Sequence, residues 1–148
     1  MAHAAPASRA VTRRVGPPDV FSERAHAIAR WAWPVTLGLV YGYWAAANVR
    51  YGGPITGWNL LFGFVTAIVF AAVYMGIQAL APRLPREVHA VLWGAFTAIA
   101  VGFLYSLSGH GHTVLESTIL GVVIGAAVFC TLFYRYYTHE DAEGHRIR

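Results

Sequence analysis

The residues with the clearest chemical potential lie in one short stretch, residues 109–116. His112 and Glu116 are four positions apart, so on an α-helix they would share a face. His110 could fold over them as a third ligand. Imidazole nitrogens and a carboxylate oxygen suit Zn²⁺ or Cu²⁺. The pattern therefore raises the hypothesis of a metal site in this turn.

The same stretch also has a purely structural interpretation. Thr113 and Glu116 fit the capping-box pattern, in which each side chain accepts a hydrogen bond from the other residue's backbone N–H. An acidic residue at a helix start also faces the positive end of the helix dipole. Because the cap explains Glu116 without any ligand, we favour it and expect no metal, cofactor or catalytic residue here.

A second group of polar residues lies near other predicted helix ends. A metal or proton-handling site could be assembled from them, but histidine at a membrane interface ordinarily contacts headgroups. We therefore expect headgroup contacts for this group: His26, His89 and His139, with Glu87, Glu140 and Asp141. The lone Cys130 excludes intramolecular disulfides and thiolate metal clusters.

The elements that must position these residues are dominated by apolar sequence. No Asp, Glu, Lys, Arg or His occurs between residues 51 and 82. A helix of ~20 residues crosses the ~30 Å hydrocarbon core, and the apolar residues here run all round the helix. The whole chain is 57% hydrophobic and 12% charged, whereas soluble domains average about 25% charged. The chain is therefore predicted to be an integral membrane protein.

We predict an all-α integral membrane protein with four transmembrane helices in an antiparallel up-down bundle. The spans are placed within a transmembrane domain of residues 31–138, at about residues 31–48, 58–81, 88–106 and 114–134. Residues 1–18 are predicted to be a disordered cytoplasmic tail and residues 139–148 a polar cytoplasmic tail. For residues 19–30 we predict an amphipathic juxtamembrane helix, with a solvated extension of the first span as the alternative.

The arginines predict the orientation of the spans. All 11 basic residues are Arg, and only Arg50 lies in the first or third loop. The others lie in the N-terminal segment, the second loop and the C-terminal end, which by the positive-inside rule places both termini in the cytoplasm. We therefore expect a bacterial cytoplasmic membrane, anionic phospholipid headgroups at its inner face, and no nucleic acid as a partner.

Small residues recur at every fourth position in all four predicted spans. Helices associate in lipid by close backbone approach over such residues. We therefore predict helix packing at seven glycines: Gly38, Gly42, Gly63, Gly94, Gly102, Gly121 and Gly125. Alignment of Gly42 with Gly102 and of Gly63 with Gly121 leaves open a parallel repeat of two helical hairpins.

The spans carry no feature of a pump or channel. No ionisable residue lies at mid-span, and no selectivity-filter signature occurs. We expect a non-enzymatic structural or accessory subunit of the plasma membrane that packs against other membrane proteins. In size, topology and the aromatic stretch at residues 133–137 the chain resembles the small four-span accessory subunits of bacterial respiratory oxidases, which implies a similar role.

Two alternative functions stay open. The first is a small homo-oligomeric transporter or channel, because a single four-helix bundle is small for an enclosed pathway. The second, ranked lowest, is a metal-dependent membrane enzyme that uses His110 and His112.

Overall fold

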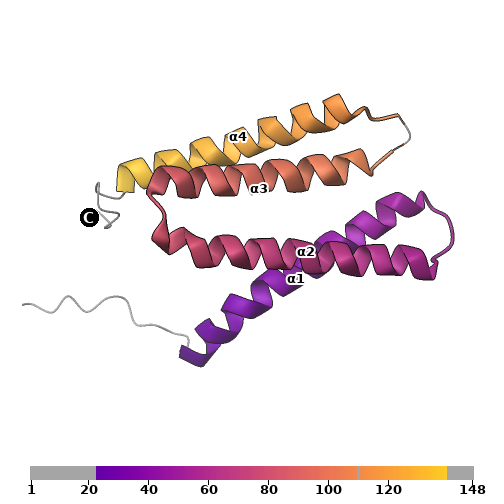
Figure 1. The fold of residues 1–148 in the computed structure, drawn as a ribbon, viewed down its shortest axis with the longest axis horizontal. Helices are drawn as coiled ribbons and strands as arrows, with labels where there is room; N and C mark the ends of the chain where they lie inside the picture. Colours follow the sequence, from indigo (N-terminus) through magenta and orange to yellow (C-terminus); the bar gives the residue numbers. More distant parts are fainter. Residues whose placement is uncertain (1–22, 110, 140–148) are drawn as a thin grey trace, which may run out of the picture.

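The computed structural model describes residues 23–109 and 111–139 (Figure 1). These residues form four α-helices and no β-strand: α1 (Glu23–Arg50), α2 (Gly57–Leu80), α3 (Arg86–Ser106) and α4 (Val114–His139). A short 3₁₀ turn, η1 (Ala81–Arg83), leads from α2 towards α3. Residues 1–22, His110 and residues 140–148 lie outside the described residues, and with them the predicted N-terminal tail and most of the C-terminal one.

Three of the helices, α2, α3 and α4, are long and apolar enough to cross a membrane. The prediction of an all-helical chain with membrane-spanning segments is confirmed to this extent for the part of the chain that the structure describes. Helix α1 is not among the three, because Trp, Tyr, Pro34 and Asn48 lower the mean hydropathy even of its uncharged part.

Helix α1 is continuous over 28 residues. The residues expected in a separate juxtamembrane helix, from Glu23 onward, are therefore the first turns of the same helix as the expected span. Pro34 lies inside this long helix and not in its first turn, and its side chain is fully buried. Proline there removes one backbone hydrogen-bond donor from the helix.

The helices pair as two antiparallel hairpins, α1 with α2 and α3 with α4 (Figure 1). Within each hairpin the two backbones lie close at many positions, whereas the backbones of the two hairpins come close at few, and large side chains make the contact between them. The turns at residues 51–56 and 107–113 lie at one end of the molecule, the turn end. The start of α1, the 81–85 connection and the end of α4 lie at the other, the arginine end.

Local chemistry explains the first of these turns. Tyr51 and Gly52 adopt positive φ values of 48° and 79°, which reverse the chain after α1. Helix α2 then begins at Gly57, because the Thr56 hydroxyl accepts a hydrogen bond from the N–H of Asn59 at 3.2 Å. The Asn59 side chain donates back to the Ala46 carbonyl oxygen at 2.8 Å and ties the two helices together at this end.

All seven glycines named above lie where two backbones of the same hairpin come close, and we call these two lines of contact the glycine seams. A methyl group added at Gly42 would clash with the Gly63 carbonyl oxygen and lie 2.8 Å from the Ala67 methyl group. In the second hairpin, a methyl group at Gly94 would lie 3.0 Å from the Gly125 carbonyl oxygen. Glycine is therefore needed at the seams for the helices to approach as they do.

The two seams have corresponding registers, but with a different alignment from the one that the sequence suggests. Gly42 lies against Gly63 and the residue four positions later. In the second hairpin, Ala98 lies in the same way against Gly121 and Gly125. Gly102 instead lies against Gly121 and Ser117, the residue four positions before it. By these contacts Gly42 corresponds to Ala98, which lies one helical turn before Gly102.

The seam makes a direct prediction for Gly42→Ala. Glycine to alanine in a helix ordinarily stabilises by up to ~1 kcal/mol, but here the new methyl group would push α1 away from α2. We expect a lower melting temperature in mild detergent. Gly76→Ala in α2 is the matched control, because its methyl group would meet nothing within 4 Å, and its melting temperature should stay level or rise. Equal shifts in the two variants would contradict the seam.

Candidate functional site

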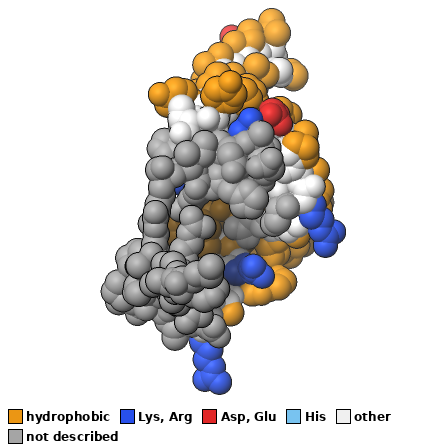
Figure 2. Space-filling view, turned by 90° about the vertical axis from the view of Figure 1, so that its left-hand side faces the viewer, with side chains coloured by type: hydrophobic (Ala, Val, Ile, Leu, Met, Phe, Trp, Pro, Cys, Tyr) orange, Lys and Arg blue, Asp and Glu red, His pale blue; other side chains and the backbone are white. Residues whose placement is uncertain are grey.

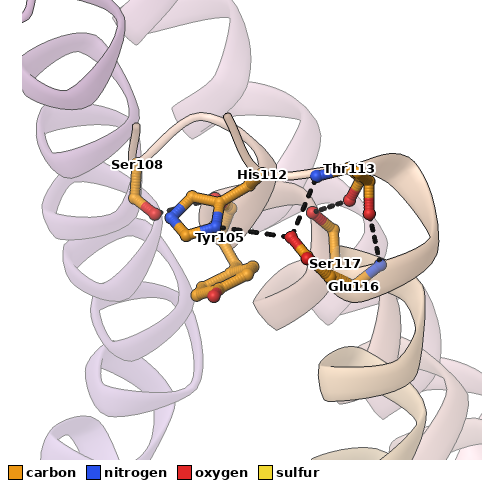
Figure 3. Close-up of polar contacts among 6 residues, drawn as sticks. All are labelled: Tyr105, Ser108, His112, Thr113, Glu116 and Ser117. Carbon is orange, nitrogen blue, oxygen red and sulfur yellow. Dashed lines mark hydrogen bonds and ion pairs between the residues drawn. The ribbon is translucent and has the colours of Figure 1, made fainter. Parts of the chain in front are cut away.

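The start of α4 holds both hydrogen bonds of a capping box (Figure 3). The Thr113 N–H donates to Glu116 Oε2 at 3.1 Å, and the Glu116 N–H donates to Thr113 Oγ1 at 3.1 Å. The Ser117 N–H and hydroxyl both donate to the Thr113 carbonyl oxygen, each at 3.1 Å. Thr113 therefore acts as the N-cap, and Glu116 has a structural role that needs no ligand.

His112 joins this cap to the end of α3. Its Nδ1 lies 3.7 Å from Glu116 Oε2, and its ring lies 4.2 Å from that of Tyr105, centroid to centroid (Figure 3). A methyl group at Gly109 would touch the same ring at 3.2 Å, so the imidazole fills the space inside the turn. The contacts of His112 are thus those of a residue that packs a turn.

The metal hypothesis finds only part of its ligand set here. His112 and Glu116 are adjacent, and the Glu116 oxygen nearest to His112 already accepts the Thr113 N–H. His110 lies outside the described residues. Among the residues that the structure does describe, no three His, Cys, Asp or Glu side chains are grouped so as to hold a metal ion.

Of the second histidine group, His26, His89 and Glu87 are described, and all three lie at the arginine end. His89 Nε2 accepts a hydrogen bond from Trp93 Nε1 at 2.9 Å, and its ring stacks on Tyr136 with centroids 5.2 Å apart. His26 is exposed near the start of α1. The side chain of His139, and both Glu140 and Asp141, lie outside the described residues. His89 therefore contributes to the packing of α3 on α4.

The contact between the hairpins depends on residues that the sequence analysis did not single out. The Tyr41 hydroxyl in α1 donates to the Ala100 carbonyl oxygen in α3 at 2.7 Å, and Asn48 Nδ2 donates to the Leu104 carbonyl oxygen at 3.4 Å. The available signal was a tyrosine in the middle of an apolar run. It marks a hydroxyl that needs a partner but does not identify that partner.

Aromatic rings continue this contact between the hairpins. The Tyr41 ring stacks on Phe70 with centroids 4.5 Å apart, and Phe70 lies 5.0 Å from Phe96. Tyr74 meets Trp93 edge to face at 4.9 Å. Large rings thus hold α2 against α3, where no glycine seam brings the backbones together.

An apolar groove of 580 Å³ lies beside these rings, between α2 and α3, and we call it the inter-hairpin groove. Thr66 and Tyr41 are the polar residues in its lining. Apolar side chains from both helices form its walls, among them Val69, Val73 and Ile77 from α2 and Leu92, Ala95 and Ile99 from α3. A smaller hollow of 310 Å³ lies at the arginine end, lined by Arg30, Trp31 and Gln78 among others.

Charge is distributed unevenly between the ends of the molecule. Of the described arginines, Arg50 lies at the turn end and five lie at the arginine end: Arg24, Arg30, Arg83, Arg86 and Arg135. Figure 2 looks onto the arginine end and shows the blue side chains at separate places around it, beside hydrophobic surface.

The cap and the metal hypotheses make opposite predictions for the turn. If the cap is the role of these residues, Thr113→Ala should lower the free energy of unfolding by about 1 kcal/mol. Neither the parent nor His112→Ala should then contain bound metal. Thr118→Ala is the matched control, because that hydroxyl only bonds the Val114 carbonyl oxygen of its own helix. Metal analysis of untagged protein and thermal melts measure both effects. One Zn²⁺ or Cu²⁺ per chain, lost in His112→Ala, would contradict the cap as the sole role.

Comparison with protein-family models, with curated proteins and with solved structures finds no match to this chain. Neither a family nor an activity comes from relatives. The functional conclusion therefore rests on the residues and geometry described above.

Proposed function

We propose that this chain is a small four-span protein of the plasma membrane that acts as a non-enzymatic accessory subunit, packing its helix faces against other membrane proteins. The observation that carries the proposal is the arrangement of the hairpins. Each hairpin is internally tight, yet the backbones of the two hairpins come close at few positions, and many of the large apolar side chains are exposed. Such a molecule leaves extended helix faces outside its own packing, and these faces are available for close contact with helices of another membrane protein.

Several features support α1 as the fourth span. At ~1.5 Å per residue its 28 residues are ~42 Å long, enough to cross the hydrocarbon core. It runs antiparallel to α2, which is itself long and apolar enough to span (Figure 1). Exposed Trp31 and Trp33 lie towards its arginine end, and exposed Tyr51 follows its other end, as expected for residues at the two membrane interfaces.

The accessory role is favoured over transport by the chemistry of the interior. Polar side chains between the hairpins are few, and Tyr41 and Asn48 already donate to backbone carbonyl oxygens. The inter-hairpin groove is almost wholly apolar. The described part of one chain therefore offers an ion or a polar solute no continuous row of polar ligands across the membrane. A transporter would need a pathway formed between several copies, which is the alternative that we retain.

Purification under gentle conditions tests the accessory role. The chain, carrying a small C-terminal tag, is isolated from its native membrane in mild detergent, and its partners are identified by quantitative mass spectrometry. We expect a different membrane protein at a fixed ratio to the chain, absent from a parallel isolation of an unrelated tagged four-span protein. Recovery of the chain as a homo-oligomer without any such protein would contradict the proposal and favour the transporter.

The orientation has its own test. In a Cys130→Ala background, single cysteines at Gly53, Leu84 and Gly111 are treated with a membrane-impermeant maleimide in intact cells. Because the arginine end should face the cytoplasm, we expect labelling at Gly53 and Gly111 only. Leu84→Cys should react after the cells are opened, which controls for its accessibility. Labelling of Leu84→Cys in intact cells would contradict the proposed orientation.

A further inference from the structure

We infer that the inter-hairpin groove holds one acyl chain of an anionic phospholipid, whose phosphate group binds Arg83 at the arginine end. This assigns a ligand-binding site to the face between α2 and α3. The site requires α2 and α3 to lie in a bilayer, but it does not depend on the accessory role. A failure of either idea therefore leaves the other testable.

The groove has the size and chemistry of a site for a flexible apolar chain. Its 580 Å³ falls within the ~300–1,000 Å³ typical of small-ligand sites. A membrane-spanning helix, as a cylinder ~10 Å wide and ~30 Å long, occupies about four times this volume. An acyl chain is narrow enough to lie between the two helices and to contact both walls. If the groove were empty, the side chains of its walls would lose those dispersion contacts.

The position of Arg83 supplies the charge complementarity. Ile77 on α2 and Leu92 on α3 are the lining residues nearest the arginine end of the groove, and the connection between the two helices lies beyond them along the chain. Arg83 follows Ile77 by six positions, a rise of ~9 Å if helical. A lipid with its chain in the groove therefore has its headgroup at the level of this connection.

Arg83 is also the cation of this connection that is left for a headgroup. Its side chain is exposed, and no hydrogen bond or ion pair joins it to the rest of the described chain. Arg86, by contrast, pairs with Glu87 at 3.4 Å and lies over the Tyr137 ring at 5.5 Å. Basic residues at the cytoplasmic ends of membrane helices are typical sites for anionic headgroups.

A second copy of the chain is a less suitable occupant. Two copies that docked side by side along this groove in the same orientation would bring their arginine ends together. Five described arginines lie at that end, and like charges at close range disfavour such a pairing. An anionic phospholipid meets the same surface with the opposite charge.

Native mass spectrometry tests the site directly. The purified full chain in detergent is stripped of lipid and mixed with equal amounts of phosphatidylglycerol and phosphatidylcholine that carry identical acyl chains. We expect a single retained lipid per chain and a preference of about fivefold for phosphatidylglycerol, the effect of one arginine near a headgroup. Arg83→Gln should abolish the preference, and Ala95→Trp, which fills the groove, should abolish retention of both lipids.

Matched variants control for nonspecific effects. Arg24→Gln removes a charge at the same end but outside the groove, and Ala72→Trp adds a ring to an exposed position of α2 that does not line the groove. Both should retain lipid as the parent does. Lipid retention that is equal in the parent, Arg83→Gln and Ala95→Trp would overturn the proposal. So would a parent that forms a lipid-free dimer which Ala95→Trp disrupts, because the occupant would then be a second copy.

A measurement on the unaltered chain covers variants that fail to fold. Phosphatidylglycerol with a photoactivatable diazirine in its acyl chain is cross-linked to the protein in vesicles of phosphatidylcholine. We expect the cross-links to be concentrated on the groove-lining segments, residues 65–77 and 92–103. Val122 and Val123 on the exposed face of α4 provide the background level. Cross-links distributed evenly over these segments and α4 would overturn the proposal.

Discussion

Close approach of backbones over glycine is the interaction on which the rest of this structure depends. In lipid, helices gain nothing by hiding apolar side chains from one another, so van der Waals contact between backbones has to hold them together. The glycines that permit this contact lie between α1 and α2 and between α3 and α4. The described chain is therefore built from two tightly packed hairpins, and the larger side chains lie on the remaining helix faces.

This division determines how the hairpins meet. Large rings at the boundary, such as Phe70 and Phe96, hold the backbones of α2 and α3 apart. The Tyr41 and Asn48 side chains then find partners in backbone carbonyl oxygens of α3, which removes the cost of leaving them unpaired in an apolar surrounding. The inter-hairpin groove is the space that this ring-to-ring contact leaves unfilled. The close packing within each hairpin and the groove between the hairpins thus both follow from where the small and the large residues lie.

Local features were predictable from the sequence, because the residues that interact in them are close neighbours along the chain. The apolar runs that predict spans correspond to α2, α3 and α4, and the spacing of Thr113 and Glu116 predicts a cap whose two hydrogen bonds are present. Non-local features were not predictable. Glycine spacing indicates which helix faces pack, but it does not determine the register of the two helices to better than one helical turn. The sequence aligns Gly42 with Gly102, whereas the contacts make Ala98, one turn earlier, the residue that corresponds to Gly42. Nothing in the sequence pairs Tyr41 with a carbonyl oxygen 59 residues away.

Disulfide formation across the seams tests the hairpin arrangement most directly. In a Cys130→Ala background, the pairs Ala46→Cys with Gly63→Cys and Gly94→Cys with Phe129→Cys are oxidised in native membranes. In each pair the β-carbon built on the glycine lies 3.0 Å from that of its partner, and a small separation of the helices gives the ~3.8 Å that a disulfide prefers. We expect both pairs to form disulfides and Ala46→Cys with Leu61→Cys, on the exposed face of α2, to stay reduced. Equal oxidation of the seam and exposed-face pairs, or none at either seam, would contradict the two glycine-packed hairpins.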